Sequence, residues 1–127
     1  MKADSVIDQK SVAFGIRIVK VCRFLQENKK EFVLSKQLLR SGTAIGAMIK
    51  ESEFAESKAD FIHKLSIALK EANETKYWLL LLHESEYFND SSYESVNEDC
   101  LNLIRLLVSI IKRMKCVAWF FINIKMW

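Results

Sequence analysis

Apolar residues recur along this chain in four stretches, and short polar segments separate the stretches. Within each stretch the apolar positions alternate intervals of three and four residues, which places them on one side of an α-helix. We therefore predict four helices, over about 5–29, 34–55, 58–87 and 92–115. The third stretch shows the pattern without a break, at Phe61, Leu65, Ala68, Ala72, Thr75, Leu79 and Leu82.

The four apolar stripes together predict a helical bundle. Alternating intervals of four and three are typical of helices that pack at shallow angles, and short connections make each helix antiparallel to the one before it. The predicted fold class is all-α, an antiparallel up-and-down four-helix bundle. The other three stripes are Ile7, Phe14, Ile18, Val21 and Leu25; Leu38, Gly42, Ile45, Ile49 and Ser52; and Val96, Cys100, Leu103, Leu107, Ile110 and Met114.

Polar residues mark where these helices are expected to start. Three Ser-x-x-Asp/Glu boxes begin at Ser5, Ser57 and Ser91. In each box the hydroxyl can accept a hydrogen bond from a first-turn amide, and the acid three residues later lies near the positive helix end. A fourth start is expected near Ser35, after the polar segment QENKKEF.

Composition agrees with long helices in one domain. The chain of 127 residues has no proline and only three glycines, so it carries few residues that interrupt regular structure. We assign residues 1–115 to the bundle and residues 116–127, CVAWFFINIKMW, to an apolar C-terminal tail. The tail is far shorter than the roughly 20 residues that a membrane span needs. We expect it to pack on the bundle or on a neighbouring copy, with no membrane partner.

The third and fourth stretches carry apolar residues outside their main stripe, among them Leu69, Trp78, Leu101 and Ile104. A helix that is apolar over much of its circumference is buried on more than one side. A monomeric four-helix bundle has nothing to cover this second face. We therefore expect a homo-oligomer.

Gly42 and Gly46 lie one turn apart within the second predicted helix, although glycine there costs about 1 kcal/mol relative to alanine. Together with Ala47 they leave one helix face bare, so that another helix backbone can approach closely. The crossing helix belongs either to the same chain or to a neighbouring copy. Both explanations concern packing and neither requires catalysis.

Charge is distributed unevenly, although the formal net charge is only +3. Residues 1–50 carry ten basic against four acidic side chains, residues 51–100 carry four against twelve, and the last 27 residues carry five basic and no acidic ones. The basic residues near the N-terminus are either a solvated face or a surface that contacts nucleic-acid phosphates. The candidate nucleic-acid-binding residues are Lys10, Arg17, Lys20, Arg23 and Arg40.

No motif in the sequence indicates a catalytic site, a cofactor site or a metal site. Asp60 and His63 have the spacing of half a di-iron motif, but such sites need two Glu-x-x-His pairs and two further glutamates, and capping already explains Asp60. The three cysteines lack CxxC spacing, which favours free buried thiols in a reducing cytoplasm. We expect a cytoplasmic, non-enzymatic protein without a cofactor.

The run LLRSGTAIGAMIKESEFAESKADFIHKLSIALKEANETKYWLLLL resembles the four-helix-bundle proteins encoded in intervening sequences of bacterial 23S rRNA genes, often called S23 ribosomal proteins. The resemblance covers residues 10–115. Two features depart from it, namely Met48, where the family usually has Asn, and the apolar tail. The residues that carry the resemblance are Arg40-Ser41-Gly42-Thr43, Ile45-Gly46-Ala47, Glu51, Ala59-Asp60-Phe61, the block KLSIALKEANET and Tyr77-Trp78.

The resemblance implies a homopentamer, with Gly42, Gly46, Ala47, Tyr77 and Trp78 as the candidate residues for helix packing or the oligomer interface. The chain is also similar to the accessory proteins of diversity-generating retroelements, which are pentamers that bind nucleic acid and a reverse transcriptase through basic surfaces. The implied partners are further copies of the chain, RNA or DNA, and a protein such as a reverse transcriptase. The expected function is a nucleic-acid or RNA-associated accessory factor; the alternative is a self-assembling protein–protein interaction scaffold without nucleic-acid binding.

Overall fold

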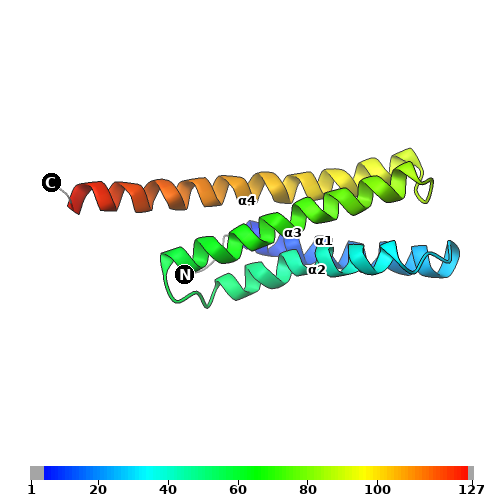
Figure 1. The fold of residues 1–127 in the computed structure, drawn as a ribbon, viewed down its shortest axis with the longest axis horizontal. Coiled ribbons are helices and arrows are strands. Elements are labelled where there is room, and N and C mark those ends of the chain that lie inside the picture. The colour runs from blue at the N-terminus through cyan, green and yellow to red at the C-terminus, as the bar shows by residue number, and fades with distance from the viewer. Residues whose placement is uncertain (1–4, 126–127) are drawn as a thin grey trace.

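The computed structural model describes the backbone of residues 5–125 and the side chains of residues 6–116. This part of the chain forms α1 (Ser5–Asn28), α2 (Leu34–Ser52), α3 (Lys58–Glu84) and α4 (Asp90–Lys125), and no strand. In Figure 1 short loops connect the helices, and the C-terminal part of α4 extends past the ends of the other three. The predicted all-α four-helix bundle is confirmed.

The helices contact one another in a ring, in the order α1, α2, α3, α4 and back to α1. Within the described residues the backbones of the two diagonal pairs, α1 with α3 and α2 with α4, do not approach each other closely. The contact between α1 and α4 is much the smallest of the four, so this side of the bundle is the least closed.

The core follows the predicted stripes closely. Every stripe position of α2 and α3 is buried. Two predicted stripe positions, Val21 of α1 and Met114 of α4, are only half-buried, and next to Val21 it is Cys22 that is buried. Ser11 of α1 is buried although it is polar. The buried Thr75 hydroxyl donates to Ser41 Oγ at 2.9 Å, so these two buried hydroxyls of α3 and α2 are paired.

Two of the three predicted capping boxes fall on described side chains, and one of them is wrong. Ser57 Oγ accepts a hydrogen bond from the Asp60 amide at 3.0 Å, which confirms the predicted start of α3. At the start of α4, Asn89 Oδ1 accepts from the Ser92 amide at 2.7 Å, and Ser91 plays no such part. The box at Ser5 lies outside the described side chains.

The start of α2 is capped by an acid that the sequence pattern does not identify. The Glu31 carboxylate accepts from the backbone amides of Val33, Leu34 and Ser35 at 3.0, 2.7 and 2.7 Å, and this residue is only 7% exposed. Burial raises the pKa of Glu31, but the hydrogen bonds from the three amides and the Ser35 hydroxyl more than offset this effect. The net result is a pKa below the usual range.

The two glycines of α2 face α1 of the same chain. A Cβ on Gly42 would lie 2.9 Å from both Cγ1 and Cγ2 of Ile18, closer than side-chain atoms tolerate. A Cβ on Gly46 would meet only ordinary contacts, the nearest being Ser11 O at 3.5 Å. At Gly42 the helix that crosses α2 closely is therefore α1 of the same chain, which is one of the two explanations for the bare face.

Predicted helix ends differ from the observed ends by a few residues. Both α2 and α3 end three residues earlier than predicted, at Ser52 and Glu84. The α3 terminus closes with Glu86 in a left-handed conformation (φ 67°), where the Tyr87 amide donates to Leu82 O at 2.9 Å. The backbone of the predicted tail continues α4 as a helix through Lys125. The expected packing of the tail falls outside the described side chains.

Candidate nucleic-acid interface

A groove runs along the weak contact between α1 and α4, and it contains two cavities. We call it the α1/α4 groove and define it by the residues that line these cavities. The larger cavity, of about 630 Å³, lies between α1, the α3–α4 loop and the start of α4. The smaller one, of about 330 Å³, lies nearer the α1 N-terminus and is lined by Lys10, Ala13, Phe14, Arg17, Asp99, Asn102 and Leu103.

Arg17 lies between the two cavities and lines both of them. Its guanidinium donates to Asp99 Oδ2 at 2.6 Å and to Ser95 Oγ at 2.8 Å, so it joins α1 to α4. Both charged side chains are partly exposed, so the ion pair adds little stability. Its main effect is to fix the position of a positive charge in the middle of the groove.

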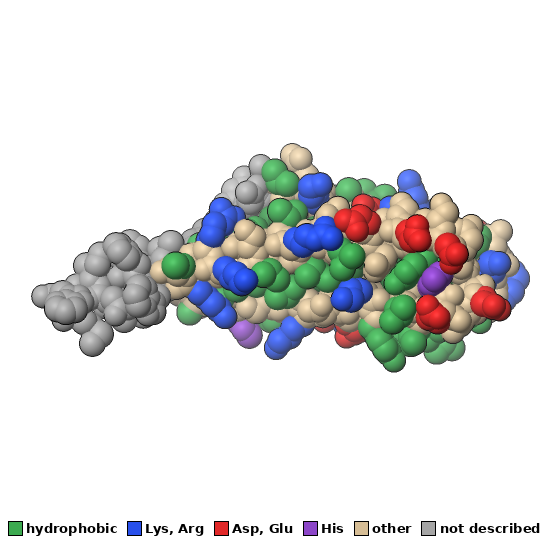
Figure 2. Space-filling view, turned by 90° about the horizontal axis from the view of Figure 1, so that it is seen from above, with side chains coloured by type: hydrophobic (Ala, Val, Ile, Leu, Met, Phe, Trp, Pro, Cys, Tyr) green, Lys and Arg blue, Asp and Glu red, His purple; other side chains and the backbone are tan. Residues whose placement is uncertain are grey.

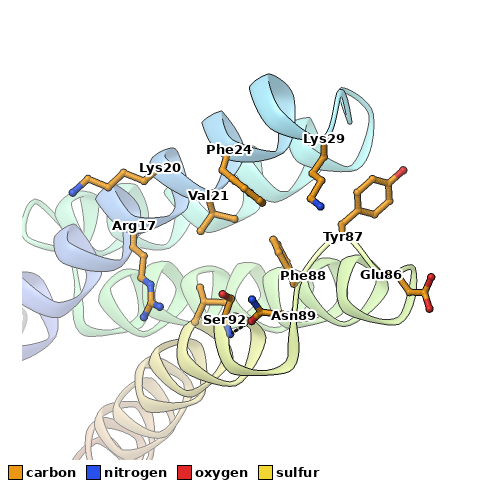
Figure 3. Close-up of a pocket in the computed structure, with 11 residues that line it drawn as sticks. Arg17, Lys20, Val21, Phe24, Lys29, Glu86, Tyr87, Phe88, Asn89 and Ser92 are labelled. Carbon is orange, nitrogen blue, oxygen red and sulfur yellow. Dashed lines mark hydrogen bonds between the residues drawn. The ribbon is translucent and has the colours of Figure 1, made fainter.

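The larger cavity combines aromatic and basic side chains. Phe24 comes from α1, and Tyr87 and Phe88 come from the α3–α4 loop. In Figure 3 the side chain of Lys29 points down into the space between these elements, and that of Lys20 points along α1 away from the rings. The complete lining is Arg17, Lys20, Val21, Phe24, Lys29, Glu86, Tyr87, Phe88, Asn89, Ser92 and Val96.

Three of the predicted nucleic-acid-binding residues remain available on α1. Lys10, Lys20 and Arg23 are exposed, and none of them forms an ion pair with another described side chain. Lys10 and Lys20 line the groove, whereas Arg23 lies outside both cavities. The structure thus brings Lys10, Arg17 and Lys20 together.

Basic residues of α4 extend this surface. Arg113 is exposed and lies about four helical turns beyond Asp99, hence on the side of α4 that faces α1. Lys112 and Lys115 are exposed beside it. Figure 2 shows basic side chains gathered toward the C-terminal end of α4 and acidic ones toward the opposite end of the molecule.

Arg40, the fifth predicted residue, lies apart from the groove, on the contact between α2 and α3. Its guanidinium pairs with Glu71 at 3.1 Å and with Glu74, and the hydrogen bond to Glu74 is the main reason its pKa is raised. Trp78 Nε1 also donates to Glu74, at 3.0 Å, and this bond together with Arg40 lowers the pKa of the Glu74 carboxyl. Arg40 of α2 and Trp78 of α3 therefore both bind the Glu74 carboxylate within the α2–α3 contact.

The other predicted packing residues differ in exposure. Trp78 is half-buried, and Tyr77 is 52% exposed and packs edge-on against it, with ring centroids 5.1 Å apart. Ala47 is exposed and Gly46 is half-buried. A contact of these residues with a second copy stays a prediction.

The sequence does not predict four of the residues that line the larger cavity, namely Phe24, Lys29, Tyr87 and Phe88. Phe24 falls off the apolar stripe of α1, which is the one signal that marks it as a surface aromatic. Tyr87 and Phe88 fall at or just beyond the end of the predicted third helix. Only the packing of the loop against α1 shows that these rings share a cavity.

The described side chains show no arrangement typical of a reactive centre. No group of three or more metal-ligating residues occurs among them. Burial raises the pKa values of the Cys22 and Cys100 thiols to about 12, which keeps them protonated and unreactive. His83 Nε2 donates to Asp90 Oδ1 at 2.7 Å and the ring stacks on Tyr93, so the His83 ring is held in a surface contact. None of the described helices is long and apolar enough to cross a membrane.

Comparison with known proteins identifies the family. Residues 3–109 match the model of the family described as 23S rRNA-intervening sequence protein. The fold is similar to the crystal structure of a protein of unknown function from the S23 ribosomal protein family of Bacteroides thetaiotaomicron. That chain is 57% identical, with a TM-score of 0.84 over 85% of this chain and 96% of its own. No curated protein matches this chain. Because the family model spans most of its length, the chain belongs to the 23S rRNA-intervening sequence protein family.

Proposed function

We propose that this protein is a non-enzymatic, homo-oligomeric accessory factor that binds RNA or DNA along the α1/α4 groove. The observation that carries the proposal is a line of basic side chains along the groove, two of which, Lys10 and Lys20, have no acidic partner among the described residues. Arg17 lies between these two lysines and is paired with Asp99, and Arg113 of α4 lies beyond the Lys10 end of the groove. Cations in this arrangement contact phosphates and release counterions without reading a base sequence.

The test is binding of a structured RNA hairpin, measured by fluorescence anisotropy between about 50 and 200 mM salt. We expect affinity to fall steeply with salt. The variant Lys10→Glu/Lys20→Glu/Arg113→Glu should weaken binding and reduce the salt slope by about one unit for each phosphate that the protein no longer neutralises. Arg17 is left intact, because a carboxylate there would oppose Asp99 and disturb the α1–α4 contact.

Lys70→Glu is the matched control. Lys70 is exposed on α3 and lines neither cavity, so this charge reversal lies outside the groove. We expect it to bind like the wild type. Absence of affinity even at the lowest salt would remove the nucleic-acid function.

Homo-oligomerisation is supported by an apolar stripe on the outer side of α1. Val12, Ile16 and Val19 follow helical spacing, and they are 44%, 55% and 40% exposed. A contiguous stripe of this kind is typical of a surface that another protein covers. We propose that it meets further copies of the chain, with a pentamer as the preferred assembly.

The same stripe favours a second candidate function, a scaffold that assembles with itself or with a protein partner and does not bind nucleic acid. Lys10→Glu separates the two candidates, because Lys10 lines the groove and lies on a different side of α1 from the stripe. Lost RNA binding with an intact oligomer favours the accessory factor. A broken oligomer favours the scaffold.

A further inference from the structure

The larger cavity has aromatic rings on opposite walls. The side chains of Phe24, from α1, and Phe88, from the α3–α4 loop, point toward one another across the space (Figure 3). Within the described residues the two close ring pairs are Tyr77–Trp78 and His83–Tyr93, so the Phe24 and Phe88 rings do not themselves stack. Both rings line the cavity of about 630 Å³, so the cavity offers a planar group one ring on each wall.

Positive charge flanks this space on both sides. Lys29 Nζ lies 6.0 Å from the centre of the Phe24 ring, and Arg17 is held at the other end by Asp99 and Ser95. Glu86 is the one acidic residue of the lining, and Asp99, just outside it, pairs with Arg17, so Lys20 and Lys29 supply the unpaired positive charge. The cavity therefore suits a ligand that has a flat apolar part and negative charge on either side of it.

The size of the larger cavity limits which ligands can enter it. A volume of about 630 Å³ is within the roughly 300–1,000 Å³ typical of pockets for small molecules or single chemical groups. The bases of a duplex are stacked on their neighbours inside the double helix, so they cannot enter such a pocket without being unpaired. An unpaired base presents both faces, and every base has a π-face that an aromatic side chain can stack on.

We infer that the larger cavity binds one unpaired base of a single-stranded nucleic acid, stacked between Phe24 and Phe88, with Lys29 and Arg17 beside its flanking phosphates. This inference rests on the proposed function and makes it specific. Binding depends on stacking as well as on charge, and the protein prefers single strands to duplexes.

The experiment compares two probes at low salt, a fluorescein-labelled single-stranded U12 RNA and a labelled 12-base-pair RNA duplex. We expect the wild type to bind U12 more tightly than the duplex. Phe88→Leu and Phe24→Leu should each weaken U12 binding by roughly five- to a hundredfold, as expected for loss of one stacking platform. Duplex binding, which relies on the basic residues alone, should change little.

Phe54→Leu is the matched control, since Phe54 is 85% exposed in the α2–α3 connection at the other end of the bundle. It should leave U12 binding unchanged. Phe88 is partly packed on the core, whereas Phe24 is 42% exposed, so the Phe24 variant retains the fold if the Phe88 variant does not.

The outcomes separate this inference from the proposed function. Equal affinity for U12 and the duplex, or unchanged U12 binding in Phe24→Leu, would overturn the stacking site and leave nucleic-acid binding in place. Binding of neither probe would overturn both. Preference for U12 that both leucine variants reduce, with Phe54→Leu unaffected, would establish the site.

Discussion

Gly42 and Gly46 occupy similar positions along α2, one turn apart, but their surroundings differ. The β-branched Ile18 side chain fills the space beside Gly42, whereas the neighbours of Gly46 stand at ordinary contact distance. The spacing of two glycines in a sequence indicates a bare helix face. It cannot show which neighbour occupies that face, because this depends on how α1 is rotated about its axis.

This difference predicts opposite effects of the same substitution. Gly42→Ala should destabilise the bundle by about 1–3 kcal/mol, because the added methyl collides with Ile18 and the collision outweighs the gain in helix propensity. Gly46→Ala should be neutral or stabilise the fold by up to about 1 kcal/mol. Urea unfolding of the two variants beside the wild type measures both effects. Equal effects at the two positions would contradict the crossing described at Gly42.

The lowered pKa of Glu31, at the start of α2, predicts that the stability of the fold depends on pH. Its pKa is lower in the folded state than in the unfolded chain, so its contribution is complete above the unfolded pKa and is lost as pH falls through the folded pKa. Glu31→Gln should therefore cost about 1–3 kcal/mol at neutral pH, and this cost should shrink below about pH 4.5.

The measurement is chemical denaturation of wild type and variant at several pH values. Glu27→Gln is the matched control, because Glu27 is exposed at the end of α1. A difference between wild type and Glu31→Gln that stays constant from pH 7 to about pH 3 would show that the carboxylate is not the cap.

At the scale of the helix, the sequence predicts how many helices form, their order and which face of each is buried. It does so because the spacing of apolar residues follows the face of a helix that packs on its neighbours. Each buried stripe position of α3 was predictable, down to Thr75. Helix ends are harder, because one side chain sets each of them and several neighbours can compete for the role. Ser91 has the favoured spacing to Glu94, but Asn89 reaches the free amide first and adds two residues to α4.

The cap of α4 gives a direct test of this competition. Asn89→Ala should reduce stability by about 1 kcal/mol, since it removes the acceptor for the Ser92 amide. Ser91→Ala should change stability by less than about 0.5 kcal/mol, because Ser91 is exposed and does not cap the helix. Thermal unfolding followed by circular dichroism measures the stability of both variants. A larger loss of stability for Ser91→Ala than for Asn89→Ala would support the capping box predicted from the sequence.

The candidate site was partly predictable at this scale. Lys10, Arg17 and Lys20 share a side of α1, which helical spacing shows. Arg40 does not belong to the site, because acidic residues of α3 engage it. Phe24 and Phe88 are far apart in sequence and line one cavity only because the α3–α4 loop folds toward α1, an arrangement that no local pattern encodes.

For the whole molecule, the exposed stripe of α1 predicts how assembly can be broken. Ile16→Glu places a charge in the middle of the stripe, where Ile16 is 55% exposed in the single chain. We expect the variant to keep its helical spectrum and to sediment as a smaller species than the wild type, because burying an unpaired carboxylate in an interface is costly.

The control for this variant is Val33→Glu, at an apolar residue that is 73% exposed in the α1–α2 loop. It should sediment like the wild type. If Ile16→Glu and the wild type have the same mass at equal concentration, the stripe does not mediate assembly and another surface must be considered.

The contrast among the three cysteines has a practical consequence for counting subunits. Cys22 and Cys100 are buried with raised pKa values, whereas Cys116 is exposed. A maleimide dye should modify one thiol per native chain at neutral pH and three in denaturant. Stepwise photobleaching of dye-labelled assemblies would then report their stoichiometry one particle at a time, without any engineered tag.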